Sequence, residues 1–310
     1  MQTRTMVLFP YSGYQPSSPR EKNFCSIVDA CLRIENDKRP VVVLNSDTIR
    51  RGTANAFLSE FDGEGTRSGD VEILKVWSVD SCQMWLAGWG HILDSDPDAS
   101  RIAQVPGDID LIVRMNAFYN NLDNYLTASN RDIIVGDFSG GEAFSAKNLI
   151  DTYGTLPLLA NWFPEVSQGI TEIPLTKPRS EFLNIERSVL EVLLRHRKFA
   201  YEQTLNMLIR SWDFESSTWS YEVRSHHFGE VIDDTEYRKY RDCLDQVERT
   251  ERMLRLIWRE INEPEPLSEL EPSANQARYA KFVDEYIVRD RRSTSIRETA
   301  IITIRNLIGP

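Results

Sequence analysis

Residues 100–110, SRIAQVPGDID, contain an apolar run that ends in two aspartates spaced one residue apart, Asp108 and Asp110. In an extended chain the side chains at positions i and i+2 point to the same side, so both carboxylates project into one space. Two carboxylates in one space repel each other unless a cation lies between them, and oxygen ligands of this kind suit Mg²⁺ or Mn²⁺. The stretch therefore predicts a strand that ends at a divalent metal site.

Short apolar runs alternate with longer amphipathic segments on both sides of this stretch. We predict strands at 5–10, 40–47, 71–78, 100–105 and 131–138, with helices at 21–34, 53–61 and 81–93. Strands separated by segments of helix length imply parallel crossovers. The expected fold class is therefore α/β, a doubly wound and mostly parallel sheet with helices on both faces. Ligands of such sheets bind at the carboxyl ends of the strands, where Asp108 and Asp110 fall.

The second half of the chain is mostly helical. We predict helices at 145–163, 181–212, 235–261, 274–288 and 293–308, the last of which also fits a strand. We further predict a strand at 219–231 that contains two adjacent histidines, and an acidic, proline-rich linker at 262–273. This pattern predicts one domain over residues 1–232 and a helical C-terminal extension over 233–310. The apolar face of the 235–261 helix fits packing against its own domain or against a second copy of the chain.

The composition is acidic, with a formal net charge of -11 over 310 residues and an isoelectric point near 5.0. Such a balance argues against general binding to nucleic acid or to an anionic membrane. The 4 cysteines contain no CxxC pair, which fits a reducing cytoplasm better than a disulfide framework or a zinc site. No segment approaches the roughly 20 apolar residues of a membrane span, and we expect no signal peptide.

The first strand is followed by FPYSGYQP (9–16), which contains neither a GxGxxG fingerprint nor a Walker phosphate loop. Recognition of a nucleotide would therefore depend on the metal rather than on a glycine-rich cradle.

Several stretches, taken in order, resemble the GT-A glycosyltransferases, most closely the retaining group that includes mannosylglycerate synthase and glucosyl-3-phosphoglycerate synthase. They are LFPYSGYQP, GDID, IIVGDFSGGEAFSAKNLIDTYGTLPLLANWFPE, PLTKPRSEFLNIERSVLEVLL, YEQTLNMLIRSW and RSHHFGE, and together they span roughly residues 5–232. The resemblance implies a GT-A fold and a homodimer. It also implies metal-dependent transfer of a sugar from a UDP- or GDP-linked donor to a small hydroxylated, anionic acceptor, with retention of configuration.

The resemblance also implies roles for individual residues. GDID corresponds to the family's DxD motif, so Asp108, Ile109 and Asp110 would hold the donor and Mg²⁺ or Mn²⁺. A downstream histidine, His226 or His227, would complete the metal shell. The nucleotide base would lie near two short segments, at Pro10, Tyr11, Ser12, Asn45 and Asp47.

Four further side chains are candidates for the acceptor and the reaction. Lys177 and Arg179 would bind an acceptor carboxylate or phosphate, Arg179 through a bidentate fork, or else lie in a solvated loop. Glu202, in YEQT, would orient the acceptor hydroxyl or stabilise positive charge at the anomeric carbon. Glu181 would accept a sugar hydroxyl or pair with Arg179.

The sequence also departs from the family in two places. Pro106 and Gly107 stand between the apolar run and the DxD, and WSVDSCQMW (77–85) replaces a loop that contains lysine and glycine in the relatives. A sugar-phosphate nucleotidyltransferase and a catalytically degenerate GT-A-like binding protein therefore remain as alternatives.

Overall fold

The computed structural model of the chain describes residues 2–9, 19–34, 39–76, 81–107, 115–127, 130–138, 150–173, 175–195, 203–215, 220–226 and 236–262. The chain forms two compact units, which we describe separately. The first contains residues 1–140 and 180–231, and the second contains 141–179 and 232–310. The segment 141–179, which the sequence-based division left in the first domain, thus groups with the C-terminal helix.

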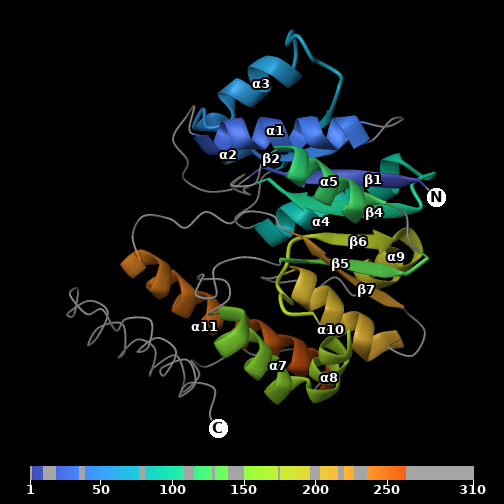
Figure 1. The fold of residues 1–310 in the computed structure, drawn as a ribbon, viewed down its shortest axis with the longest axis vertical. Coiled ribbons are helices and arrows are strands. Elements are labelled where there is room, and N and C mark those ends of the chain that lie inside the picture. The colour runs from blue at the N-terminus through green and yellow to red at the C-terminus, as the bar shows by residue number, and fades with distance from the viewer. Residues whose placement is uncertain are drawn as a thin grey trace. The chain divides into compact units, whose positions relative to one another are not determined.

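The first unit is built on a seven-stranded sheet in the order β3-β2-β1-β4-β6-β5-β7 (Figure 1). The strands are β1 (Thr3–Leu8), β2 (Val41–Asn45), β3 (Glu72–Val76), β4 (Arg101–Pro106), β5 (Ile133–Phe138), β6 (Leu183–Glu186) and β7 (Tyr221–His226). The pairs β1–β2, β1–β4, β2–β3 and β5–β7 are parallel, whereas β6 runs antiparallel to both of its neighbours, β4 and β5. The predicted α/β class and mostly parallel sheet are confirmed.

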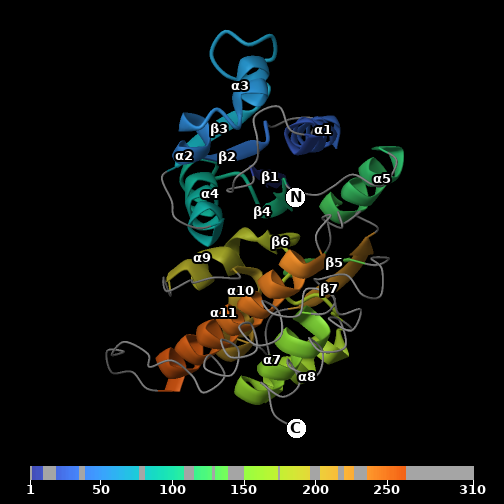
Figure 2. The ribbon, with the colours of Figure 1, turned by 90° about the vertical axis from the view of Figure 1, so that its left-hand side faces the viewer.

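Helices of the first unit cover both faces of this sheet. They are α1 (Pro19–Ile34), α2 (Ser46–Arg50), α3 (Asn55–Phe61), α4 (Ser81–Ser95), α5 (Met115–Leu126), α9 (Arg187–Arg195) and α10 (Gln203–Glu215). In Figure 2, α1 and α5 lie on one side of the strands, and α4 and α9 lie on the other.

The face under α1, α3 and α5 has an aromatic core. Phe24 and Ile27 of α1 are spaced for one side of a helix, and both are fully buried. The Phe24 ring lies 4.5 Å from that of Phe9 and 5.1 Å from that of Phe57, measured between centroids. Because Phe9 directly follows β1 and burial of a phenylalanine contributes roughly 1.5–3 kcal/mol, this cluster holds the carboxyl end of β1 in place.

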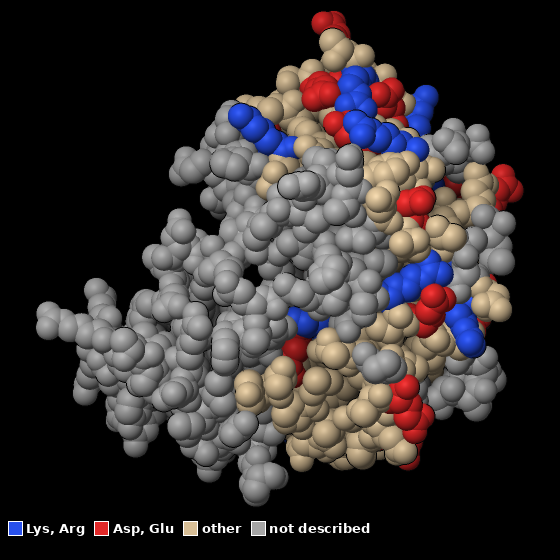
Figure 3. Space-filling model, in the orientation of Figure 1, with Lys and Arg blue, Asp and Glu red and all other residues tan. Residues whose placement is uncertain are grey.

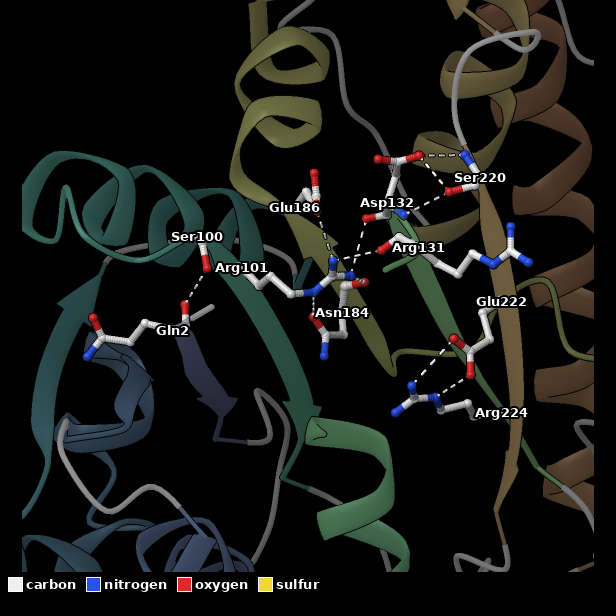
Figure 4. A network of polar contacts seen from close by, with 10 residues as sticks. All are labelled: Gln2, Ser100, Arg101, Arg131, Asp132, Asn184, Glu186, Ser220, Glu222 and Arg224. Carbon is white, nitrogen blue, oxygen red and sulfur yellow. Dashed lines mark hydrogen bonds and ion pairs between the residues drawn. The ribbon is translucent and has the colours of Figure 1, made fainter. Parts of the chain in front are cut away.

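A buried arginine joins the central strands at the opposite end of the sheet (Figure 4). The Arg101 guanidinium donates to the backbone oxygens of Arg131 (2.7 Å), Asp132 (3.3 Å) and Asn184 (3.1 Å). It also donates to Oδ1 of Asn184 at 2.9 Å, and the Glu186 carboxylate lies 3.5 Å away. One side chain of β4 thus satisfies acceptors on β6 and at the start of β5.

The second unit contains a π-helical turn, η1 (Asp151–Thr155), followed by α7 (Leu156–Trp162), α8 (Pro164–Glu172) and the long helix α11 (Glu236–Asn262). A side chain on Gly154 would overlap Val247 of α11, so η1 packs closely on that helix. The rings of Trp162 and Trp258 lie 5.9 Å apart. The apolar face of α11 is therefore used, at least in part, within its own unit.

Several elements differ from the prediction. The segment 181–212, predicted as helix throughout, contains the strand β6 and two helices, α9 and α10, and the helices α2, α5 and α8 were not predicted. The helices predicted at 274–288 and 293–308 lie outside the described residues. Within the part of the chain that is described, no helix is long and apolar enough to cross a membrane.

On the face shown in Figure 3, acidic and basic side chains of the described residues lie next to one another. Near α3, for example, Arg67 contacts the carboxylates of Asp29, Glu60 and Asp70 at 2.5–3.0 Å. Such pairing leaves no single-sign patch on this part of the face.

Candidate active site

The carboxyl ends of six strands meet one edge of the sheet. β1, β2, β3 and β4 end there, and so do β5 and β7, because β5 is antiparallel to β6 and therefore parallel to β4. The antiparallel strand β6 begins at this same edge, so Glu181 and Phe182 arrive there too. Ligands of doubly wound sheets bind at such an edge, which makes it the candidate active site.

The end of β4 lies against the end of β1. Pro106 is still paired with Leu8 in register, so of the two residues that depart from the family's pattern, Pro106 belongs to the strand and Gly107 follows its end. A Cβ at Gly107 would overlap the carbonyl oxygen of Leu8 and lie 2.5 Å from the Phe24 ring. Gly107 therefore permits a close backbone approach that no other residue type allows. Asp108 follows directly.

Gln104, two residues before the end of β4, is fully buried and contacts both chain segments that carry the candidate glutamates. Its Nε2 donates to the backbone oxygen of Glu181 at 2.7 Å and to Oγ1 of Thr204 at 3.2 Å. Thr204 lies in the first turn of α10, two residues after Glu202. The start of α10 therefore lies beside β4, near the carboxyl edge.

The backbone at Gln104 is held from the other face of the sheet. Tyr125 of α5 donates its hydroxyl hydrogen to the Gln104 backbone oxygen at 3.1 Å, and the side-chain amide of Asn184 donates to the backbone oxygen of Tyr125 at 3.4 Å. Burial raises the pKa of Tyr125 well above its ordinary value, so the hydroxyl stays a donor at neutral pH. β4 is thus anchored on both faces just before it reaches the acidic pair.

The structure brings Asn45 to this edge but buries its side chain. Asn45 ends β2, is fully buried, and its amide lies 3.8 Å from Sδ of Met84 in α4. Asp47 follows in α2, and its side chain is outside the description. A hydrogen bond from Asn45 to a nucleotide base would require the amide to turn away from α4.

Lys177 and Arg179 belong to the second unit, and both are buried, with 6% and 8% exposure. Nε of Arg179 donates to Asp151 of η1 at 2.7 Å, and Nη1 donates to Oε1 of Gln246 in α11 at 2.9 Å. Arg179 therefore joins three parts of its unit and does not lie in a solvated loop. Glu181 belongs to the first unit and is half-buried.

The remaining candidates lie wholly or partly outside the described residues. Pro10, Tyr11, Ser12, Asp108, Ile109, Asp110, Glu202 and His227 are not described, and for His226 only the backbone is, as the last residue of β7. In the described ranges, no three histidine, cysteine, aspartate or glutamate side chains gather as a metal site would need.

The sequence analysis did not predict that Gly107 and Gln104 contribute to the site. Gln104 could have been found, because it is a glutamine inside the otherwise apolar run IAQV.

No family model matches the chain, and no curated protein matches it. Among solved structures, it is similar to glucosyl-3-phosphoglycerate synthase from Mycobacterium tuberculosis in complex with Mn²⁺, UDP and phosphoglyceric acid. The TM-score is 0.52 at 14% identity, over 86% of this chain and 80% of that one. The chain shares the GT-A fold of these structures.

A second structure of that synthase, with Mn²⁺, UDP-glucose and glycerol 3-phosphate, has a TM-score of 0.52 at 14% identity over 86% of this chain and 82% of that chain. The GT-A likeness predicted from the sequence is thus confirmed at the level of the fold.

Proposed function

We propose that this chain is a metal-dependent glycosyltransferase that moves a sugar from a nucleoside diphosphate donor to a small hydroxylated acceptor. The observation that carries the proposal is the carboxyl edge of the sheet, where β4 ends at Pro106, two residues before Asp108 in the sequence. Two of the solved structures of the similar synthase contain UDP, one together with Mn²⁺ and the other together with Mg²⁺. They support a donor of the same chemical class here.

The residue types at the edge fit a divalent cation. Asp108 and Asp110 follow β4 without an intervening insertion, because β4 is paired up to Pro106 and Gly107 lies against Leu8. Carboxylate oxygens are preferred ligands of Mg²⁺ and Mn²⁺. When bound, the ion would stabilise negative charge on the departing diphosphate as a Lewis acid. The role of the two aspartates is to hold that ion and, through it, to orient the donor.

A histidine ligand makes a further demand on the chain. β4 and β7 are separated by β6 and β5 in the sheet, which amounts to three strand spacings of about 4.8 Å each. His226 or His227 would therefore reach the ion only if the residues after β4 or β7 cross the edge. We propose one of these two histidines as the third protein ligand.

We propose that Glu202 and Glu181 act on the sugar and the acceptor. Both are tied to β4 through contacts of their neighbours or their own backbone. A carboxylate beside the anomeric carbon stabilises positive charge that develops as the diphosphate leaves. We also propose that the configuration at the anomeric carbon is retained. The acceptor would then approach from the same face as the leaving diphosphate.

For the acceptor, we propose a small molecule with a phosphate or carboxylate. The synthase of the same fold is in complex with phosphoglyceric acid in one structure and with glycerol 3-phosphate in another. Lys177 and Arg179 are the proposed cationic partners. An anion at Arg179 would share the guanidinium with Asp151, so its recognition is coupled to the stability of the second unit.

The test is turnover of UDP-glucose and GDP-mannose by the purified full chain, with 3-phosphoglycerate or glycerol 3-phosphate as acceptor, in the presence and absence of Mn²⁺. We expect Mn²⁺-dependent release of UDP or GDP and a glycosylated product. Asp108→Ala/Asp110→Ala should lower turnover by about 10²-fold or more. The control is Asp94→Ala/Asp98→Ala, which removes two exposed acids, one in the last turn of α4 and one in the turn that follows it.

Three outcomes would overturn the proposal. In the first, neither donor is bound or turned over. In the second, turnover is the same with and without Mn²⁺. In the third, the two double variants are equally active. Release of pyrophosphate from a nucleoside triphosphate and a sugar phosphate would instead identify a nucleotidyltransferase.

A further inference from the structure

We infer that Gln104 is a positioning residue for the proposed sugar transfer, because its carboxamide holds the two glutamate-bearing segments beside the strand that leads to the acidic pair. The inference rests on the proposed function and adds to it a residue that makes no contact with the substrate.

The position of Gln104 in the sheet would suit an apolar side chain. Its partners in register are Met6 on β1 and Leu183 on β6, and the residue is fully buried. Its Oε1 has no hydrogen-bond partner in the described part of the chain. Burial of a polar group that is only partly satisfied is unfavourable. An apolar residue of similar size would avoid that penalty, so stability of the sheet alone does not account for glutamine at this position.

The two acceptors of the Nε2 amide lie far apart in sequence. One is the backbone oxygen of Glu181, at 2.7 Å, just before β6 begins, and the other is Oγ1 of Thr204, at 3.2 Å, in the first turn of α10. Glu181 lies before the paired residues of β6, which run from Leu183 to Glu186, and α10 is a helix outside the sheet. The sheet ladder therefore does not join the two segments. Gln104 therefore provides a polar link between these segments inside the first unit.

The two hydrogen bonds of Gln104 position the backbone at or near two glutamates. Glu181 carries the bonded oxygen on its own backbone, and Glu202 precedes Thr204 by two residues. Asp108 follows Gln104 by four residues along β4 and its continuation. A displacement of about 1 Å between reacting groups lowers a rate by roughly 10²-fold. Loss of the carboxamide would therefore slow the chemical step more than it would weaken binding of metal and nucleotide.

The main variant is Gln104→Leu, which keeps the size of the side chain and removes its two hydrogen bonds. We expect kcat to fall by roughly 10- to 100-fold, while the Kd for Mn²⁺ and UDP changes by less than about 2-fold. Ile102→Val, on the same strand, is the control for a small loss of packing and should leave both quantities near their wild-type values.

A milder pair tests the same link from its other end. Thr204→Val removes the hydroxyl at nearly constant shape, and Thr204→Ser retains it. We expect Thr204→Val to lower kcat and Thr204→Ser to restore it to within about 2-fold of the wild type. Hydrogen exchange of the peptide over 203–209 should rise in Gln104→Leu and Thr204→Val but not in Thr204→Ser. This pair decides the matter if Gln104→Leu does not fold.

Failure of the inference is distinct from failure of the proposed function. If the wild type transfers no sugar, the proposed function fails and this inference falls with it. If the wild type is active, a folded Gln104→Leu variant with wild-type kcat overturns the inference alone. Equal kcat of Thr204→Val and Thr204→Ser, or equal losses of kcat and of Mn²⁺ and UDP binding, would also overturn it.

Discussion

Gly107 approaches Leu8 so closely that a side chain at residue 107 would overlap the Leu8 carbonyl oxygen. The contact joins the ends of β4 and β1 one residue before Asp108. Because the obstacle is backbone rather than a flexible side chain, Gly107→Ala can be accommodated only if one strand end moves. We expect a loss of about 1–3 kcal/mol in the free energy of unfolding and weaker binding of Mn²⁺ and UDP, measured by urea denaturation and calorimetry.

Gly90→Ala is the matched control for this change. Gly90 lies in α4, and a Cβ there would meet nothing within 4 Å. Replacement of a helical glycine by alanine stabilises a helix by roughly 0.5–1 kcal/mol. If both variants bind nucleotide like the wild type, the approach of Gly107 to Leu8 does not shape the site.

The sheet and the site differ in how far the sequence predicts them. The strands at β1, β2 and β4 were foreseen because continuous apolar runs bounded by polar residues are typical of buried parallel strands. β6 was missed, because LNIE is only four residues long and precedes a strongly amphipathic helix. Its extended form depends on pairing with β4 and β5, which local sequence does not reveal.

Among the candidate site residues, the residue types predict Asp108 and Asp110 as a metal site, which stays a prediction, whereas the contacts at the end of β4 could not be predicted. The partners of Gln104 lie 77 and 100 residues away in sequence, so no local spacing marks them. Arg179 was predicted either to bind an acceptor or to lie in solvent. Its contacts with Asp151 and Gln246 could not be read from PLTKPRSEF, because both partners lie on other helices.

The Arg179 and Asp151 pair predicts a test of structural against binding roles. Both side chains are nearly buried, at 5% and 3% exposure, and removal of one partner leaves an uncompensated charge. We expect Asp151→Asn and Arg179→Met each to destabilise the protein by about 3–5 kcal/mol. If Arg179 also binds the acceptor, acceptor KM should rise more in Arg179→Lys than in Asp151→Asn. Equal values of KM would restrict Arg179 to a structural role.

Arg101 should be more sensitive to substitution than the exposed basic residues. Arg101→Met would leave the backbone oxygens of Arg131, Asp132 and Asn184 without their donor, at a cost of about 1–3 kcal/mol for each buried acceptor that water cannot reach. Lys75→Ala removes a cation that is 47% exposed and pairs with Asp62, so it should change stability by less than about 1 kcal/mol. Equal urea midpoints for the two variants would contradict this ranking.

Stability should fall at alkaline pH. Burial, with help from Glu60, Glu21 and Asp29, raises the pKa of Cys25 from 9.0 to about 12, and burial raises that of Tyr221 from 10.0 to about 12. The folded state therefore favours the protonated forms. The stability that these groups contribute is complete below their unfolded values and is lost as pH rises from about 9 toward 12.

Urea denaturation at several pH values tests this effect. Cys25→Ala should flatten the decline between about pH 9 and 11, and Cys25 of the wild type should react slowly with iodoacetamide at pH 8. If the urea midpoint of the wild type is independent of pH up to about 11, the predicted loss of stability does not occur, and the protonated forms of Cys25 and Tyr221 do not stabilise the folded state.

The reversed direction of β6 has a consequence for how such a protein could change its specificity. Its neighbours β4 and β5, which run antiparallel to it, deliver side chains to the carboxyl edge as the chain leaves the sheet, whereas β6 delivers them as the chain enters it. Before Leu183 the entering segment is held through backbone oxygens, since that of Phe182 accepts from the Gly136 amide at 3.0 Å and that of Glu181 accepts from the Gln104 side chain. Sequence changes there could remodel what the edge recognises while the hydrogen-bonded scaffold stays the same.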